Sequence, residues 1–384
     1  MTKMSKKFTI LLAPDSFKES VSSIKICEYL KTGILSENNQ IEVIMAPIAD
    51  GGEGTVDALK SSPDARNIRN QVTGPLGKPV TTEWIMINSM TAVIEMASVA
   101  GLPLVPEDQR DPMKTTTYGL GELINIAIEE GAEEIIVGLG GSATNDSGAG
   151  MLQALGFSLL NQQGDPVTYG NTGLGSVYTI NDSYVPSKVK LTEFMAASDV
   201  QNPLTGPNGA SFVYGPQKGA SPAQVEMMDE NMKHFARLVH LWSGQDWSPH
   251  PGAGAAGGLG FAFLAFLNSS LQSGFEIVAK LTGLEEKICS ADWVVTGEGK
   301  LDSQTLSGKG PYGVAQMAKK NKKPVIAIGG LIDLEAEKSL LETFDVVFKI
   351  SPPGTSKKES MENVEKYLIE TGQRIAKYIT KSSD

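Results

Sequence analysis

Short apolar segments alternate with segments of helical pattern at both ends of this chain of 384 residues. Near the N-terminus, the apolar runs 8–13 and 41–46 lie on either side of residues 21–35, where apolar side chains recur every three or four positions. The same alternation resumes near the C-terminus, with apolar runs at 292–296, 324–329 and 345–350. Strands alternating with helices favour a parallel sheet that helices cover.

The middle of the chain has a different pattern. Residues 80–87 and 91–96 read as strands joined by Asn88-Ser89-Met90, which predicts a hairpin. Helical patterns follow at 115–130, 222–242 and 257–267, and one closes the chain at 358–381. We therefore predict an α/β protein with a parallel-sheet domain made from both chain ends, residues 1–66 and 290–384. A mixed α/β domain, residues 67–289, is predicted to be inserted between them.

Composition excludes several classes of function. The net charge of −11 disfavours binding to nucleic acid, although a few local lysines can still hold a small anion. The two cysteines form no CxxC pair, and the three histidines have no zinc-ligand spacing with them. The longest apolar run, 261–267, is far shorter than the roughly 20 residues of a membrane span. We expect a cytoplasmic protein with no nucleic-acid or membrane partner.

The glycine-rich segment 138–146 follows a predicted strand and opens a helix, so its backbone amides can face an anion. Gly138-x-Gly140-x-x-Ala143 also fits a dinucleotide fingerprint, with Asp165 about 20 residues further on. The hydroxyl and carboxamide side chains of the segment favour phosphate and metal instead. A turn that only permits close strand–helix packing is the alternative without a ligand.

Six further loops carry residues suited to anion or metal chemistry, and five of them have a plain structural alternative. The segment 252–260 suits phosphate or tight packing, and 296–302 suits magnesium and phosphate or a solvated turn. Asp15 and Asp50 follow the first two strands, where either is equally a helix N-cap. Asp199 ends a short apolar run, and a carboxylate there either accepts the proton of a substrate hydroxyl or belongs to a plain surface turn. The segment 215–219 places Lys218 in a tight turn.

Taken in order, these segments resemble the type I glycerate kinase family of bacteria, and the resemblance runs over nearly the whole chain. The matching motifs are Asp15-Ser-Phe-Lys18, Pro47-Ile-Ala-Asp50-Gly-Gly, 138–146, Asp199-Val-Gln-Asn-Pro-Leu-Thr-Gly206, Gly215-Pro-Gln-Lys-Gly219, 252–260 and Gly297-Glu-Gly-Lys-Leu-Asp302. The resemblance implies a flavodoxin-like domain beside a second α/β domain, with the active site in the cleft between them. It also implies transfer of the ATP γ-phosphoryl group to a hydroxyl of D-glycerate in organic-acid catabolism. The 2-phosphoglycerate product is favoured, and 3-phosphoglycerate stays open.

Phosphoryl transfer requires groups that hold phosphate, Mg²⁺ that bridges it, and a carboxylate that orients the attacking hydroxyl. We expect Asp199 to be the base, with Asp50 second, and Lys18 to lie between the charges of glycerate and ATP. The predicted substrate ligands are Asp15, Ser16, Lys18, Gly51, Gly52 and Lys300. The predicted phosphate ligands are Gly140, Gly141, Ser142, Thr144, Asn145, Gly257, Gly258 and Lys218. The predicted metal ligands are Asp146, Glu298 and Asp302.

Two other functions remain open at this stage. An NAD-dependent dehydrogenase would use the fingerprint glycines, but Asp165 lies in a turn rather than at a strand end. A sensor of sugar acids on the same scaffold would bind glycerate without consuming ATP. The sequence does not distinguish a monomer from a homodimer.

Overall fold

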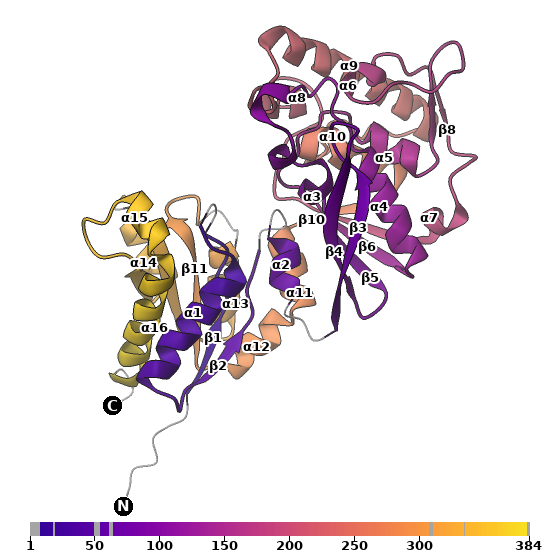
Figure 1. Ribbon diagram of the computed structural model, residues 1–384. Coiled ribbons are helices and arrows are strands. Elements are labelled where there is room, and N and C mark those ends of the chain that lie inside the picture. Colours follow the sequence, from indigo (N-terminus) through magenta and orange to yellow (C-terminus); the bar gives the residue numbers. More distant parts are fainter. Residues whose placement is uncertain are drawn as a thin grey trace, which may run out of the picture. The chain divides into compact units, whose positions relative to one another are not determined.

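The computed structural model describes residues 8–17, 20–49, 54–60, 64–306, 310–333 and 335–381. The chain divides into two compact units, each an assembly of helices and strands (Figure 1). The first unit comprises residues 1–50, 57–62 and 275–384, and the second comprises 51–56 and 63–274. The predicted α/β class is confirmed. Among the described helices, none combines the length and apolar character that a membrane crossing requires.

A sheet of five parallel strands forms the centre of the first unit, in the order β13-β12-β11-β1-β2. Its strands are β1 (Thr9–Leu12), β2 (Glu42–Met45), β11 (Trp293–Leu301), β12 (Val325–Ile332) and β13 (Val346–Lys349). Strands are thus confirmed at both chain ends. β11 is longer than predicted: its pairing with β12 continues to Leu301, through residues that we expected to form a loop.

Both faces of this sheet are covered, which explains why its strands are apolar at consecutive positions. Ile10 and Leu12 pack with apolar residues of α1 (Ser23–Glu37) and α16 (Val364–Lys381). Leu11, between them, faces the opposite side and packs with the other helices. Those helices are α11 (Gly274–Leu281), α12 (Leu284–Ser290), α13 (Gly310–Lys320) and α14 (Glu337–Thr343).

The C-terminal segment that the pattern predicted as one helix is two. α15 (Lys357–Glu362) ends at Asn363, whose backbone N–H and side-chain amide both donate to the carbonyl of Glu359. α16 then runs beside α1 (Figure 1). Their backbones approach closely, since a Cβ added at Gly33 would lie 2.0 Å from the carbonyl oxygen of Ile369.

The second unit contains a mixed sheet of six strands, in the order β10-β9-β6-β5-β4-β3. β3, β4 and β5 are antiparallel neighbours, and the remaining pairs are parallel. Asn88 and Ser89 have φ of 50° and 59°, and the N–H of Met90 donates to the carbonyl of Ile87, so a tight turn at 87–90 joins the paired strands and the predicted hairpin is confirmed. The strands are β3 (Ala65–Thr73), β4 (Pro79–Ile87), β5 (Thr91–Glu95), β6 (Glu134–Gly138), β9 (Glu193–Ala197) and β10 (Ser270–Gln272).

β3 is the longest of the strands that the sequence pattern missed. It lies at the edge of the sheet and is largely exposed, so its side chains are mostly polar and leave no apolar alternation. The long predicted helix at 222–242 is confirmed as α9 (Pro222–Ser243), which begins with a capping box of Ser221 and Gln224.

The other elements of the described chain are short, apart from α4 and α10. They are α2 (Thr55–Leu59), α3 (Ala97–Ala100), η1 (Leu102–Leu104), η2 (Glu107–Gln109), α4 (Tyr118–Glu129), α5 (Ala149–Ala154), β7 (Ser158–Leu160), α6 (Asn171–Leu174), β8 (Thr179–Asn181), α7 (Ser187–Leu191), α8 (Ala210–Tyr214), η3 (Pro216–Lys218) and α10 (Ala255–Phe266). β7 and β8 pair as a separate antiparallel ribbon.

Candidate active site

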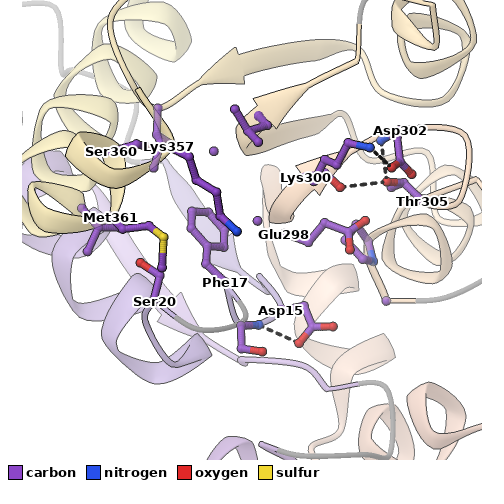
Figure 2. A pocket seen from close by; sticks show the side chains of 18 of the residues that line it. Asp15, Phe17, Ser20, Glu298, Lys300, Asp302, Thr305, Lys357, Ser360 and Met361 are labelled. Carbon is purple, nitrogen blue, oxygen red and sulfur yellow. Dashed lines mark hydrogen bonds and ion pairs between the residues drawn. The ribbon is translucent and has the colours of Figure 1, made fainter. Parts of the chain in front are cut away.

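A pocket of about 560 Å³ lies within the first unit (Figure 2). Segments that follow β1 and β13 reach it, together with the ends of β11 and β12 and the start of α13. Ligands bind at the carboxyl ends of strands in open parallel sheets, so this is the position expected of a site. The pocket brings together five predicted site residues, namely Asp15, Ser16, Glu298, Lys300 and Asp302.

Asp15 is held where the loop after β1 meets the end of β11. Its backbone N–H donates to the carbonyl of Gly297 at 2.8 Å, and its Oδ1 accepts from the N–H of Ser16 at 2.6 Å. The side chain is nearly buried and packs against Gly310 at the start of α13. Asp15 is therefore a fixed carboxylate in the wall of the pocket.

Lys300 and Asp302 form an ion pair, with Nζ and Oδ2 2.8 Å apart (Figure 2). The hydrogen bond between them lowers the pKa of the Asp302 carboxyl and raises the pKa of the Lys300 ammonium. Asp302 also accepts from the N–H of Gln304 at 2.8 Å. The charge of Asp302 is thus largely engaged by protein groups. Glu298 lies on β11 itself.

The second unit places the glycine-rich loop 139–147 between β6 and α5. Gly140 and Gly141 are accessible, and the residues after them are buried. The loop is tied to the end of α3 and the start of η1, since the N–H of Ala143 donates to the carbonyl of Ala100 and the N–H of Leu102 donates to the carbonyl of Gly141. An anion from solvent can therefore reach the two glycines but not the side chains of Thr144 and Asn145, which are 0% exposed.

Lys218 is a buried cation beneath this loop. Its Nζ donates to Ser142 Oγ at 2.6 Å and to the carbonyl of Thr144 at 2.7 Å. Burial lowers the pKa of Lys218 to about 7, and the charge of Asp146 opposes that shift. In this geometry the Lys218 amino group holds the loop in place from the inside.

Asp146 is fully buried and has a structural role that the sequence did not reveal. Its carboxylate accepts from the N–H and hydroxyl of Thr117 at 2.9 and 2.8 Å, and from the N–H groups of Gly148 and Gly150 at 3.2 and 3.3 Å. Burial raises the pKa of Asp146, and these hydrogen bonds oppose the rise. Since four protein donors occupy both oxygens, this geometry gives no support to the metal role predicted for Asp146.

The second glycine cluster packs directly on this loop. A Cβ at Gly257 would lie 2.0 Å from the carbonyl oxygen of Thr144, and one at Gly258 would lie 2.7 Å from Ser147 Oγ. Both glycines have left-handed φ, of 69° and 87°. Close packing therefore accounts for these glycines without any phosphate.

Asp199 lies in the loop that follows β9. β6 and β9 are parallel neighbours, and Leu139 N–H donates to the carbonyl of Ala197 at 3.0 Å. The loops after these two strands therefore leave the same edge of the sheet, so half-buried Asp199 follows the strand beside the one that leads to Gly140.

Four predicted site residues, Lys18, Asp50, Gly51 and Gly52, lie outside the described residues.

Sequence reasoning missed the wall of the pocket that α15 and the start of α16 supply. That wall consists of Lys357, Ser360, Met361 and Val364. Their helical spacing is visible in the sequence, but nothing there places that helix beside the loop after β1.

The pocket partly fits Mg²⁺, which prefers oxygen ligands and is often held by one or two carboxylates and phosphate. Glu298 and Asp15 supply carboxylates to the lining, and Asp302 adds one that Lys300 already binds. Among the described residues, no three acidic, histidine or cysteine side chains cluster closely enough to hold a metal. A bound Mg²⁺ would thus need oxygen atoms from a ligand as well.

The chain matches the model of the Glycerate kinase family over residues 10–380. A glycerate kinase of Bacillus subtilis (strain 168) is 44% identical over 368 residues, which cover 96% of each chain. A glycerate 2-kinase of Escherichia coli (strain K12) is 44% identical over 342 residues, 89% of this chain and 90% of that one.

The fold also has a counterpart among solved structures. A crystal structure of a protein described as a glycerate kinase 2, from Salmonella typhimurium LT2, superposes with a TM-score of 0.89. That protein is 40% identical, and the match covers 98% of this chain and all of the other. The similarity therefore extends across both units rather than to one of them.

The buried Lys218 predicts a pH dependence of stability. Its pKa is about 7 in the folded protein, against an ordinary value of 10.5, so the unfolded chain binds more protons between these pH values. The free energy of unfolding should therefore rise with pH across this window, by up to about 1.4 kcal/mol per pH unit from this group. Urea unfolding of the wild type and of Lys218→Met at pH 7, 8 and 9 measures this rise in the free energy of unfolding.

All other titrating groups are common to both proteins, so the difference between the two curves isolates Lys218. We expect the advantage of the wild type over Lys218→Met to grow between pH 7 and pH 9. If the difference in the free energy of unfolding stayed constant over this range, it would contradict a pKa of about 7 for Lys218 in the folded protein.

Proposed function

The chain belongs to the glycerate kinase family, and from that premise we propose that it transfers the ATP γ-phosphoryl group to the 2-hydroxyl of D-glycerate. The observation that carries the proposal is the 44% identity to a glycerate kinase over 96% of both chains. The name of the Escherichia coli relative, glycerate 2-kinase, favours the 2-hydroxyl over the 3-hydroxyl. The product is then 2-phosphoglycerate.

We assign the pocket of the first unit to glycerate. A hydroxy acid needs acceptors for its hydroxyl groups and donors for its carboxylate, and Asp15, Ser16 and Lys300 provide both kinds of group. Lys18, Gly51 and Gly52 remain proposed ligands beyond the described residues. Lys18 is the group that we propose to separate the charges of glycerate and ATP.

We assign the phosphate groups of ATP to the loop after β6. Gly140 and Gly141 are its accessible residues, so their backbone amides are the proposed direct contacts. The remaining predicted phosphate ligands are buried, and in this proposal they support the loop. They are Ser142, Thr144, Asn145, Lys218, Gly257 and Gly258.

The proposed base is Asp199, which accepts the proton of the attacking hydroxyl, with Asp50 as the second candidate. Glu298, with Asp302 beside it, is the proposed protein ligand of Mg²⁺. When bound, Mg²⁺ neutralises the charge that develops on the phosphate oxygens. A cytoplasmic location is part of the proposal and is supported by Cys27 and Cys289, which are both free thiols.

A phosphorus NMR endpoint assay tests the activity and the site of phosphorylation together. The purified protein, incubated with D-glycerate and Mg-ATP, should give ADP and a single new resonance at the position of 2-phosphoglycerate. A resonance of 3-phosphoglycerate would overturn the assigned hydroxyl and leave the kinase activity standing. Folded protein that consumes no ATP would contradict the kinase proposal and favour a sensor of sugar acids.

Asp199→Asn tests the proposed base. The variant keeps the shape of the side chain but cannot accept the proton, so kcat should fall by about 10²-fold or more. Asp182→Asn is the matched control, because Asp182 is an exposed aspartate of the same unit that pairs with Lys190 at 2.9 Å. A kcat of Asp199→Asn within threefold of the control would exclude Asp199 as the base.

A further inference from the structure

Arg110 carries a guanidinium group that the described part of the chain encloses without giving it an acceptor. Its Nε is buried and has no hydrogen-bond partner among the described residues. The residue as a whole is half-buried, so the terminal nitrogens stay open to solvent. A buried N–H without an acceptor destabilises a fold and calls for an explanation.

The segment that precedes Arg110 places it close to the loop after β6. Where the segment begins, Gly101 pairs with Ser142 of that loop in an isolated antiparallel bridge. Where it ends, Arg110 packs on Gly219, since a Cβ added to this glycine would lie 2.6 Å from the carbonyl oxygen of Arg110. Gly219 follows Lys218, whose Nζ donates to Ser142 Oγ at 2.6 Å. Both ends of the segment therefore lie against the loop or the turn that supports it.

Local hydrogen bonds hold the backbone of Arg110 in this place and engage the carboxylate beside it. The N–H of Arg110 donates to the carbonyl of Glu107 at 3.4 Å and so closes η2. Asp111, the next residue, accepts from the side-chain amide of Gln224 on α9 at 3.3 Å and pairs with Lys114 at 2.9 Å. The carboxylate next to Arg110 in the sequence is thus bonded to other groups and not to the guanidinium.

The loop after β6 itself supplies no full positive charge. Residues 139–147 include no lysine, arginine or histidine. Lys218 lies beneath the loop, where it is buried and hydrogen-bonded to protein atoms. Backbone amides such as those of Gly140 and Gly141 offer only partial charges, whereas a triphosphate carries several full negative charges. Phosphoryl-transfer sites therefore add lysine or arginine to such amides, and a planar guanidinium can bind two phosphate oxygens at once.

We infer that the guanidinium of Arg110 binds a phosphate group of ATP beside Gly140 and Gly141. This inference rests on the proposed function, which assigns the phosphate groups of ATP to this loop. Because Nε has no acceptor among the described residues, the side chain loses no hydrogen bond from this atom when it turns onto a phosphate. The bound phosphate then supplies acceptors for the guanidinium and receives the full positive charge that the loop lacks.

Arg110→Met and Arg66→Met form a matched pair for the test. Methionine keeps an apolar stem and removes every hydrogen-bond donor of the arginine. Arg66 belongs to the same unit, lies on the exposed strand β3 and pairs with Glu130 at 2.9 Å. Isothermal titration calorimetry measures the affinities of the wild type and both variants for Mg-ATP and for D-glycerate. KM for ATP and KM for glycerate are measured in parallel.

Loss of a charge-assisted hydrogen bond should weaken Mg-ATP binding, and raise KM for ATP, by about 10-fold or more in Arg110→Met. The affinity of this variant for D-glycerate should stay within twofold of the wild type, as should both affinities of Arg66→Met. Unchanged Mg-ATP affinity and KM in Arg110→Met, or a loss confined to glycerate, would overturn the inference.

Two further measurements separate contact with ATP from a merely structural role. Because the buried Nε has no acceptor among the described residues, the urea midpoint of Arg110→Met should not fall below that of the wild type. Arg110→Lys restores the charge without the planar fork and should recover part of the lost Mg-ATP affinity. A lower midpoint in Arg110→Met together with no recovery in Arg110→Lys would assign Arg110 a structural role and overturn the inference.

The proposed function can fail separately. If the wild type binds Mg-ATP but does not phosphorylate glycerate, and Arg110→Met loses Mg-ATP affinity, the role of Arg110 stands and the proposed activity falls. If the wild type phosphorylates glycerate and Arg110→Met binds Mg-ATP equally well, the activity stands and the role of Arg110 falls. If the wild type does not bind Mg-ATP, both are overturned.

Discussion

The parallel pairing of β1 with β11 joins segments 283 residues apart, and the candidate site of the first unit depends on it. The pairing continues beyond the strands, where Asp15 N–H donates to Gly297 and Thr296 Oγ1 donates to the carbonyl of Ala13. These bonds bring the loop after β1 beside the end of β11. Asp15, Glu298 and Asp302 then line one pocket although they come from opposite ends of the chain.

A different constraint shapes the second unit, where two glycine-rich segments meet. Gly257 and Gly258 admit the backbone of the loop 139–147 at a distance that any side chain would prevent. Lys218 then holds this loop from within by hydrogen bonds to its hydroxyl and backbone groups. Asp146, which belongs to the loop, ties it to Thr117 and to Gly150 of α5 by accepting their hydrogen bonds. The buried polar groups fix the position of Gly140 and Gly141, the part of the loop that solvent reaches.

The sequence pattern predicted the elements whose burial is regular. The two-sided sheet of the first unit is apolar at consecutive positions such as Ile10, Leu11 and Leu12, and the hairpin turn at Asn88 has a local signature. β3 was not predicted from the sequence because an exposed edge strand needs no apolar alternation. The break between α15 and α16 was not predicted because it falls at Asn363, with no glycine or proline nearby to mark it.

Prediction of the candidate site was limited by tertiary packing. Motifs placed Asp15, Glu298 and Asp302 at strand ends, where parallel pairing gathers them. Burial was not visible in the same motifs: Asp146 and Thr144 resemble ligands in the sequence, yet protein atoms surround them. Lys357 was missed for the opposite reason, since its helix carries no motif and only the fold brings it to the pocket.

Hydrogen–deuterium exchange with and without saturating D-glycerate tests most directly whether the pocket of the first unit is the substrate site. A bound ligand should slow amide exchange in peptides from residues 298–306, at the end of β11, and 355–364, at α15. Peptides from the exposed strand β3 serve as the internal reference and should not change. Protection confined to the second unit, or bound glycerate without protection of either segment, would contradict the assignment of this pocket to glycerate.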